Sequence, residues 1–176
     1  MVGRIEVITG CMFSGKSTEL LRRLHDVDNK FILLKPKLDT RYSLDEVITH
    51  SGEKKSAFVV NNVSEIFNYL NDIKIIGIDE AQFFSYSIVE DCLKLKKLGC
   101  TVIVAGLNKD YLNEEFKSVY GLIDIADSTT KLYAICNKCK KPASRSHRLS
   151  NETSKIFLGH KDCYEPLCKK CYENVK

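Results

Sequence analysis

Residues 10–17 read Gly10-Cys11-Met12-Phe13-Ser14-Gly15-Lys16-Ser17, and they fit the phosphate-loop pattern G-x-x-x-x-G-K-[ST]. The alternating residues 4–9 before them predict a strand, and the leucines behind them recur at helical spacing. Glycines let successive backbone N–H groups face phosphate oxygens, and the new helix points its positive end at the same place. In this pattern Lys16 reaches the β- and γ-phosphates, and Ser17 places its hydroxyl on Mg²⁺. The stretch therefore predicts a site for a nucleoside triphosphate with Mg²⁺.

Apolar runs and helical patterns alternate along the first two thirds of the chain. Strands are predicted at 4–9, 31–34, 57–60, 74–78 and 101–106, and further helices around 63–70 and 88–98. The run 101–106 is the last clear strand of the sheet. The stretch from Lys37 to about Lys55 shows no clear periodicity and is interpreted as a mobile loop. The alternation predicts an α/β fold, a parallel sheet with helices on both faces and ligands beyond the carboxyl ends of the strands.

Composition points to an ordinary globular protein. Hydrophobic residues make up 44% of the chain and charged residues 28%, and no apolar run approaches the roughly 18 residues of a membrane span. The N-terminal residues lack the charged-then-apolar layout of an export signal. Eight cysteines without such a signal indicate thiols and metal ligands in a reducing compartment. We expect a cytoplasmic protein that does not associate with membranes.

Two cysteine pairs near the C-terminus, Cys136-x-x-Cys139 and Cys168-x-x-Cys171, predict a tetrahedral zinc site. The 28 residues between Cys139 and Cys168 exceed the roughly 15–20 of the usual spacing, so we expect a loop to extend from the site. A site closed by four thiolates has no open position, and its zinc is therefore expected to be structural. Four unrelated thiols or a disulfide pair are the alternatives.

Polar residues follow two of the predicted strands. Asp79 and Glu80 come after the run 74–78, where an acidic residue commonly holds Mg²⁺ beside a phosphate loop. Glu80 can accept a proton from a substrate hydroxyl, or it can cap the helix that follows, since acidic residues favour first helical turns. Asp39 and Arg41 follow an earlier strand and are expected at the same sheet edge. Arg41 could brace the γ-phosphate and Asp39 could assist the metal, the alternative being two solvated surface residues.

Taken together, the motifs resemble those of the type II thymidine kinases. After the phosphate loop come Lys35-Pro36, Asp39-Thr40-Arg41-Tyr42, Asp79-Glu80-Ala81-Gln82-Phe83-Phe84, Ala105-Gly106-Leu107 and the two cysteine pairs. The resemblance runs in order from residue 4 to residue 171. It implies a kinase that transfers the γ-phosphate of ATP to the 5′-hydroxyl of thymidine, and also of deoxyuridine, giving thymidine monophosphate for DNA synthesis. It further implies a RecA-like P-loop fold with a small C-terminal zinc-binding domain that carries a lasso loop. Mg²⁺, structural Zn²⁺, feedback inhibition by thymidine triphosphate (dTTP) and a homotetramer are also implied.

The resemblance also implies roles for residues at matching positions. Glu80 would be the base that takes the proton of the 5′-hydroxyl. ATP would contact the phosphate loop together with Arg41, Asp79 and Gln82, and Mg²⁺ would be served by Ser17, Asp39 and Asp79. The nucleoside pocket would be lined by Met12, Phe83, Leu107, Tyr111, Ser146 and Tyr164. A lasso loop within 155–164 would read the base with the backbone of Lys155, Ile156, Phe157, Leu158 and Gly159.

The chain departs from the family pattern at a few places. Cys11 stands where the family usually has Pro, and Asn108 where it usually has Asp. Tyr111 replaces the Phe of the usual Asp-Phe-Arg-Gly, and His160 stands where many members have a second glycine. None of these is the loop lysine, the predicted base or a zinc ligand, so the implied activity stands. Tyr111, however, adds a hydroxyl to the predicted pocket wall.

Charge divides unevenly between a predicted nucleotide-binding domain at 1–134 and a predicted zinc-binding domain at 135–176. Residues 136–176 hold ten Lys and Arg against four Asp and Glu, a net charge of +6, whereas the remainder has a net charge of −2. A basic, tyrosine-containing segment is one feature of the alternative function, a nucleic-acid-binding ATPase with a zinc ribbon. Four zinc-bound thiolates would offset part of the excess. We therefore do not expect nucleic acid to be a partner.

Overall fold

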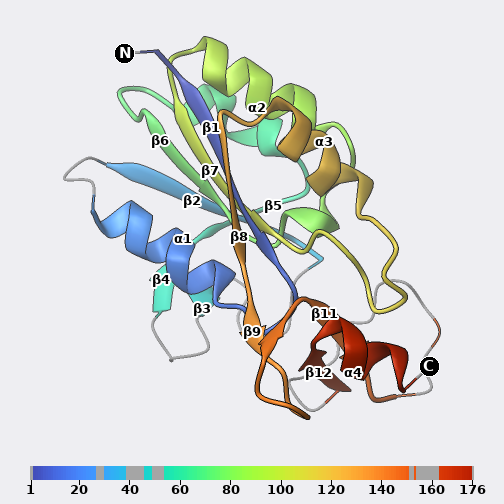
Figure 1. Cartoon of the computed structure of the whole chain (residues 1–176). Coiled ribbons are helices and arrows are strands. Elements are labelled where there is room, and N and C mark those ends of the chain that lie inside the picture. Colours follow the sequence, from blue (N-terminus) through green and yellow to red (C-terminus); the bar gives the residue numbers. More distant parts are fainter. Residues whose placement is uncertain are drawn as a thin grey trace.

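The computed structural model describes residues 2–26, 30–38, 46–48, 54–150, 153 and 163–175. In chain order its elements are β1 (Arg4–Gly10), α1 (Lys16–His25), β2 (Phe31–Pro36), β3 (Glu46–Ile48), β4 (Lys54–Ser56), β5 (Phe58–Val60), the 3₁₀ helix η1 (Val63–Tyr69), β6 (Ile75–Ile78), the 3₁₀ helix η2 (Ala81–Phe83), α2 (Ile88–Lys97), β7 (Thr101–Gly106), α3 (Lys117–Ile125), β8 (Ser128–Leu132), β9 (Ala134–Ile135), β10 (Pro142–Ala143), β11 (Arg145–Arg148), β12 (Tyr164–Leu167) and α4 (Lys169–Glu173). Figure 1 shows a large twisted sheet with the C-terminal strands and α4 beyond one of its ends.

The large sheet has six strands in the order β5-β2-β6-β7-β1-β8, and every neighbouring pair runs parallel. All four residues of β6 are buried, as expected for a strand covered on both faces. The predicted parallel α/β fold is confirmed. The carboxyl ends of β1, β6 and β7, at Gly10, Ile78 and Gly106, lie at one edge of the sheet.

The sheet contains one strand beyond the last clear strand predicted at 101–106, and the sequence prediction omits it. β8 pairs with β1 from Ser128 opposite Glu6 to Leu132 opposite Gly10, and α3 precedes it. β8 is an edge strand of exposed and half-buried residues, so it shows no apolar alternation. α3 contains Gly121, which weakens a helical pattern, yet a Cβ at that position would lie 2.8 Å from Val89 Cγ2 on α2. The close packing of α3 against α2 therefore requires Gly121, the same residue that weakens the helical pattern of α3 in the sequence.

Part of the stretch predicted as a mobile loop is a β-hairpin. β3 and β4 pair antiparallel with Val47 opposite Lys55, and the buried Val47 joins the apolar cluster under α1. A three-residue strand is too short for an alternating pattern to stand out. Residues 39–45 and 49–53 of the same stretch lie outside the described ranges.

Helices cover both faces of the large sheet (Figure 1). η1, α2 and α3 pack on one face over the larger apolar cluster, which includes Val102 and Leu122. α1 packs on the other face through Leu20, Leu21 and Leu24. None of the helices in the described ranges is long and apolar enough to cross a membrane.

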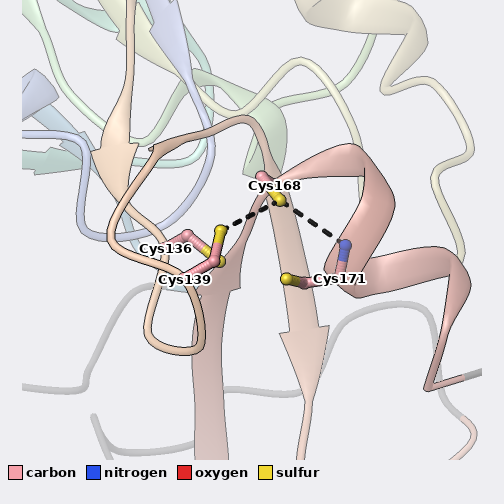
Figure 2. A group of neighbouring side chains, drawn as sticks. All are labelled: Cys136, Cys139, Cys168 and Cys171. Atoms are coloured by element: carbon pink, nitrogen blue, oxygen red, sulfur yellow. Dashed lines mark hydrogen bonds between the residues drawn. The ribbon is translucent and has the colours of Figure 1, made fainter.

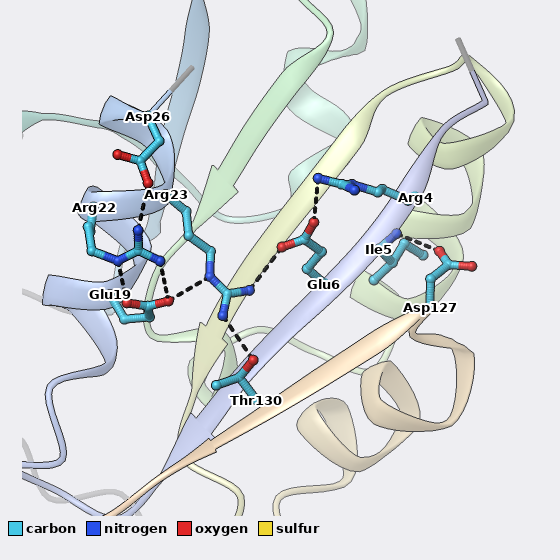
Figure 3. A network of polar contacts seen from close by, with 9 residues as sticks. All are labelled: Arg4, Ile5, Glu6, Glu19, Arg22, Arg23, Asp26, Asp127 and Thr130. Atoms are coloured by element: carbon cyan, nitrogen blue, oxygen red, sulfur yellow. Dashed lines mark hydrogen bonds and ion pairs between the residues drawn. The ribbon is translucent and has the colours of Figure 1, made fainter.

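Arg23 ties α1 to the sheet through polar contacts, drawn in Figure 3. Its guanidinium donates to Glu19 Oε1 at 2.8 Å, to Glu6 Oε2 on β1 at 2.9 Å and to Thr130 Oγ1 on β8 at 2.9 Å. The side chains of Arg23 and Glu6 are only 17% and 12% exposed, so salt screens their ion pair less than an exposed one. The contacts fix the direction of α1 relative to β1, and with it the position of the residues at the start of the helix.

The C-terminal segment consists of two small antiparallel sheets, β9–β10 and β11–β12, together with α4. Its apolar cluster contains Cys11, Ala134, Cys136, Ala143, Leu167 and Tyr172, with Phe13 packed against it. Two members of this cluster, Cys11 and Phe13, belong to the phosphate loop. The C-terminal segment and the phosphate loop thus share a core, and the domain boundary at 134/135 stays a prediction.

Candidate active site and metal centre

The phosphate loop joins β1 to α1 in a conformation that its glycines permit. Gly15 has a φ of 82° and directly precedes α1. A Cβ on Gly10 would lie 2.5 Å from the Leu132 carbonyl oxygen and 2.6 Å from Ser14 Oγ. Phe13 also has a positive φ, 65°, which is unfavourable for a residue with a side chain. The surroundings of the loop must therefore hold it in place.

The loop presents groups that fit nucleotide phosphates. The first backbone N–H groups of α1 have no helical acceptor, and the start of a helix attracts negative charge. Ser14 Oγ is buried and has no hydrogen-bond partner among the described residues, which suits a site that receives a phosphate oxygen. Lys16 Nζ donates to the Cys11 carbonyl oxygen at 2.8 Å and so lies against the loop.

Asp79 follows the buried strand β6 and is 5% exposed. Its backbone N–H donates to the Leu34 carbonyl oxygen at 2.9 Å, and its Oδ1 accepts from the Glu80 backbone N–H at 3.0 Å. Burial, together with the neighbouring Glu80 charge, raises the pKa of Asp79 to about 7. A divalent cation favours the charged form of a carboxylate. The adjacent Ser17 hydroxyl and Asp79 carboxylate are oxygen ligands of the kind that Mg²⁺ prefers.

Glu80 has a φ of 52° and precedes η2 without a side-chain capping hydrogen bond, an observation that speaks against the helix-cap alternative. Its Oε2 accepts from Gln82 Nε2, and Gln82 Oε1 accepts from the Leu107 N–H at 2.9 Å. Gln82 is 4% exposed, and its amide connects the Glu80 carboxylate to the backbone just after β7. A left-handed residue held by such contacts is a feature of functional sites.

A pocket beside the phosphate loop is lined by residues from distant parts of the chain. It brings together the six predicted pocket residues that lie in the described ranges, Met12, Phe83, Leu107, Tyr111, Ser146 and Tyr164. Its lining also includes Lys109, Asp110, Phe116 and Arg148, which the sequence prediction omits. Arg148 lies two residues after Ser146 on β11, so strand alternation would have placed it on the same face.

Arg148 organises the tyrosines of this pocket. Its side chain is buried, with Cζ 3.6 Å from the centre of the Tyr111 ring, a cation–π distance. Its Nη2 and Nε donate to the Tyr164 hydroxyl at 2.8 and 3.1 Å. The Tyr111 hydroxyl donates to the Thr153 carbonyl oxygen at 2.9 Å, and the Tyr111 carbonyl accepts from the Tyr172 hydroxyl. The hydroxyl that distinguishes Tyr111 from the usual Phe is therefore bonded to backbone.

Figure 2 shows the four predicted zinc ligands turned toward one another. The sulfurs of Cys136, Cys139, Cys168 and Cys171 all lie within 4.8 Å of one another. Cys139 Sγ and Cys168 Sγ are 3.5 Å apart, and sulfurs bound at about 2.3 Å to one tetrahedral zinc lie about 3.8 Å apart. The Cys171 N–H donates to Cys168 Sγ and holds the pKa of the Cys168 thiol below its usual range. All eight cysteines are free thiols. The four thiols are therefore not unrelated, and their arrangement fits a zinc ion.

Some predicted site residues lie outside the described ranges. They are Asp39, Arg41, Lys155, Ile156, Phe157, Leu158 and Gly159. Leu38 and Thr153 are the described residues next to these two segments. The roles predicted for the segments therefore stay predictions.

Comparison with known proteins identifies the family. The sequence model of the family described as thymidine kinase matches residues 3–172. A thymidine kinase of Bacteroides fragilis is 40% identical over an alignment of 176 positions, which covers 98% of this chain and 88% of the relative. Thymidine kinases of Rhodothermus sp. and Chloroflexus aurantiacus are each 39% identical, over 98% and 97% of this chain and 82% and 95% of their own lengths.

Among solved structures, the ATPase DotB of Legionella pneumophila is similar at a TM-score of 0.45 and 17% identity, over 81% of this chain and 44% of that one. A similarity this low does not establish a shared fold or function. The sequence matches, in contrast, extend over nearly the whole chain. They confirm the predicted resemblance, and the chain belongs to the thymidine kinase family.

Proposed function

We propose that the protein transfers the γ-phosphate of ATP to the 5′-hydroxyl of thymidine, and also of deoxyuridine, to give the 5′-monophosphate for DNA synthesis. The observation that carries this proposal is the lining of the pocket. It includes Met12 of the phosphate loop and Phe83 of η2, the helix that Glu80 directly precedes. The pocket therefore adjoins the phosphate loop through Met12, and Phe83 in its lining lies three residues after Glu80.

The phosphate loop, residues 10–17, holds the triphosphate of ATP. Lys16 turns from the Cys11 carbonyl toward the β- and γ-phosphates. The Ser17 hydroxyl and the Asp79 carboxylate would hold Mg²⁺, Asp39 would assist the metal, and Arg41 would contact the triphosphate. When bound, Mg²⁺ neutralises charge that develops on the transferred phosphoryl group.

Glu80 accepts the proton of the 5′-hydroxyl during transfer. Phosphoryl transfer depends mainly on positioning and charge stabilisation, so the direction of this carboxylate matters as much as its basicity. Gln82 donates to Glu80 and accepts from the Leu107 backbone. Gln82, which the sequence predicts at the phosphates, therefore acts through Glu80 as a positioning residue.

The base is chosen by the lasso backbone. Residues 155–159 are mostly apolar, and Lys155 carries only donors, whereas extended main chain presents both N–H and C=O groups. Thymine offers a central N–H between two carbonyl oxygens, and main-chain groups can satisfy all three. Cytosine replaces that donor with an acceptor and one oxygen with an amino group. Each buried group left unpaired costs about 1–3 kcal/mol, so deoxycytidine is rejected.

Other properties follow from the family resemblance and are part of the proposal. Zinc at the four cysteines is structural, since four thiolates leave no open position. We also propose feedback inhibition by dTTP, a homotetramer and a cytoplasmic location. Free thiols and a four-cysteine zinc site suit a reducing compartment.

Tyr111→Phe is expected to raise the KM for thymidine about 2- to 10-fold with little change in the KM for ATP. The substitution removes one hydroxyl, whose bond to the Thr153 carbonyl holds the pocket wall to the segment preceding the lasso. A single neutral hydrogen bond contributes about 0.5–1.5 kcal/mol, which sets this range.

Steady-state kinetics with each substrate varied in turn measures the effect. Tyr69→Phe is the matched control, because Tyr69 is exposed on η1 and does not line the pocket. If both variants behave like the wild type, the Tyr111 hydroxyl does not support the pocket.

The alternative function, a nucleic-acid-binding ATPase, is tested by asking what stimulates ATP consumption. The proposed kinase consumes ATP when thymidine is added and does not respond to single-stranded DNA or RNA. Stimulation by polynucleotide without any phosphorylated nucleoside would overturn the proposed function in favour of the alternative.

A further inference from the structure

Ser146 connects the nucleoside pocket to the phosphate loop. Its hydroxyl oxygen accepts from the Met12 backbone N–H at 3.0 Å, across 134 residues of sequence. The Ser146 side chain is 5% exposed and lies on β11, which pairs antiparallel with β12 of the C-terminal segment. β12 ends at Leu167, directly before Cys168, and Leu167 pairs with Arg145 at the start of β11. The middle of the phosphate loop is thereby bonded to the zinc-binding part of the chain.

Cys11, the residue before Met12, makes a second connection to the same segment. Its thiol donates to the Ala143 carbonyl oxygen at 3.3 Å, and the contact is buried. Burial raises the pKa of the Cys11 thiol, which therefore keeps the proton that it donates. The proline usual at this position in the family has no such donor.

Phe13 follows Cys11 and Met12, and the two bonds help to hold its backbone conformation. Its φ of 65° lies in the left-handed region, and its side chain packs against the apolar cluster of the C-terminal segment. A non-glycine residue stays in this region only when its surroundings fix it. The next residue is Ser14, whose buried hydroxyl has no hydrogen-bond partner among the described residues. The conformation of the phosphate-binding half of the loop thus depends on the anchored half.

We propose that Ser146, assisted by Cys11, is a positioning residue for the phosphate-donor site and couples that site to the nucleoside pocket. Ser146 uses a lone pair for the Met12 N–H and retains its own proton for a ligand in the pocket that it lines. The coupling to a bound nucleoside rests on the proposed function, whereas the positioning of the phosphate-donor site does not. Because coupling between two binding sites is reciprocal, each ligand then favours binding of the other.

Inorganic tripolyphosphate tests the inference, because it engages the phosphate loop and offers nothing to a nucleoside pocket. Its affinity is measured by calorimetry, in the presence of Mg²⁺ and without nucleoside, for the zinc-loaded wild type, Ser146→Ala, Ser146→Thr and Ser144→Ala. Loss of the acceptor leaves the Met12 N–H unpaired, so we expect Ser146→Ala to bind tripolyphosphate about 5- to 30-fold more weakly. Ser146→Thr retains the hydroxyl and is expected to restore most of the affinity.

Ser144→Ala is the matched control from the same segment. Its hydroxyl contacts Arg145 and it does not line the pocket, so tripolyphosphate affinity should stay within about twofold of the wild type. Zinc content is measured for every variant, since a merely structural defect would lower it and a positioning defect would not. If Ser146→Ala does not fold, Cys11→Ala removes the other connection and is expected to weaken tripolyphosphate binding in the same direction.

Two results separate this inference from the proposed function. Normal tripolyphosphate binding by a folded Ser146→Ala variant, with a raised KM for thymidine, would overturn the inference and leave the kinase activity standing. Weakened tripolyphosphate binding in that variant supports the inference, even if the wild type phosphorylates no thymidine.

Discussion

Glu80→Gln is expected to lower kcat for thymidine phosphorylation by about 10²- to 10⁴-fold, the usual contribution of a general base. The amide keeps the shape of the side chain, and its oxygen can still accept from Gln82 Nε2. It cannot take the proton of the 5′-hydroxyl. ATP binding should change little, because the phosphate loop and its contacts are untouched. The effect is therefore expected in kcat and not in the KM for ATP.

Single-turnover kinetics with saturating ATP and thymidine measures this effect apart from product release. Glu90→Gln is the control, since Glu90 is exposed in the first turn of α2 and does not line the pocket. A Glu80→Gln variant with near-normal kcat would show that Glu80 only orders the backbone around η2. Its positive φ would then be explained by the turn alone.

Cys168→Ser is expected to lose zinc and several kcal/mol of folding free energy. Cys168 supplies a zinc ligand, and its sulfur also accepts from the Cys171 N–H at the start of α4. α4 carries Tyr172, whose hydroxyl contacts the Tyr111 backbone at the pocket. The C-terminal segment also contacts the phosphate loop through Ser146 and Met12. The affinities for thymidine and for ATP should consequently fall together with the metal.

Metal analysis, thermal unfolding and substrate titrations measure these three effects. Cys163→Ser is the control, because Cys163 is a free thiol near the site that does not belong to the four-sulfur cluster. Wild-type protein stripped of zinc yet fully active would contradict the structural role of the metal.

Much of the fold is predictable because its central strands are apolar on both faces. The runs that became β6 and β7 are recognisable by composition alone, and the phosphate-loop pattern fixes the junction of β1 and α1. The elements that escape prediction have weak patterns for identifiable reasons. β8 lies at an edge and is mostly polar, and α3 contains a glycine that its packing requires.

The candidate site divides in the same way. The family resemblance supplies the six pocket residues that the structure gathers around one cavity. Arg148 was within reach of strand alternation from Ser146, but nothing in the sequence marks it as a partner of Tyr111 and Tyr164. The bond between Met12 and Ser146 joins residues 134 positions apart, and contacts of this kind come only from the folded chain.

The proposed phosphate transfer is tested most directly by following the γ-phosphate itself. Thymidine and ATP labelled in the γ-phosphate are incubated with the zinc-loaded protein and Mg²⁺, and the products are separated and identified. We expect one labelled phosphate on the 5′-oxygen of thymidine for each ATP consumed, and almost none on deoxycytidine. Label released as inorganic phosphate, or found on the 3′-oxygen, would contradict it.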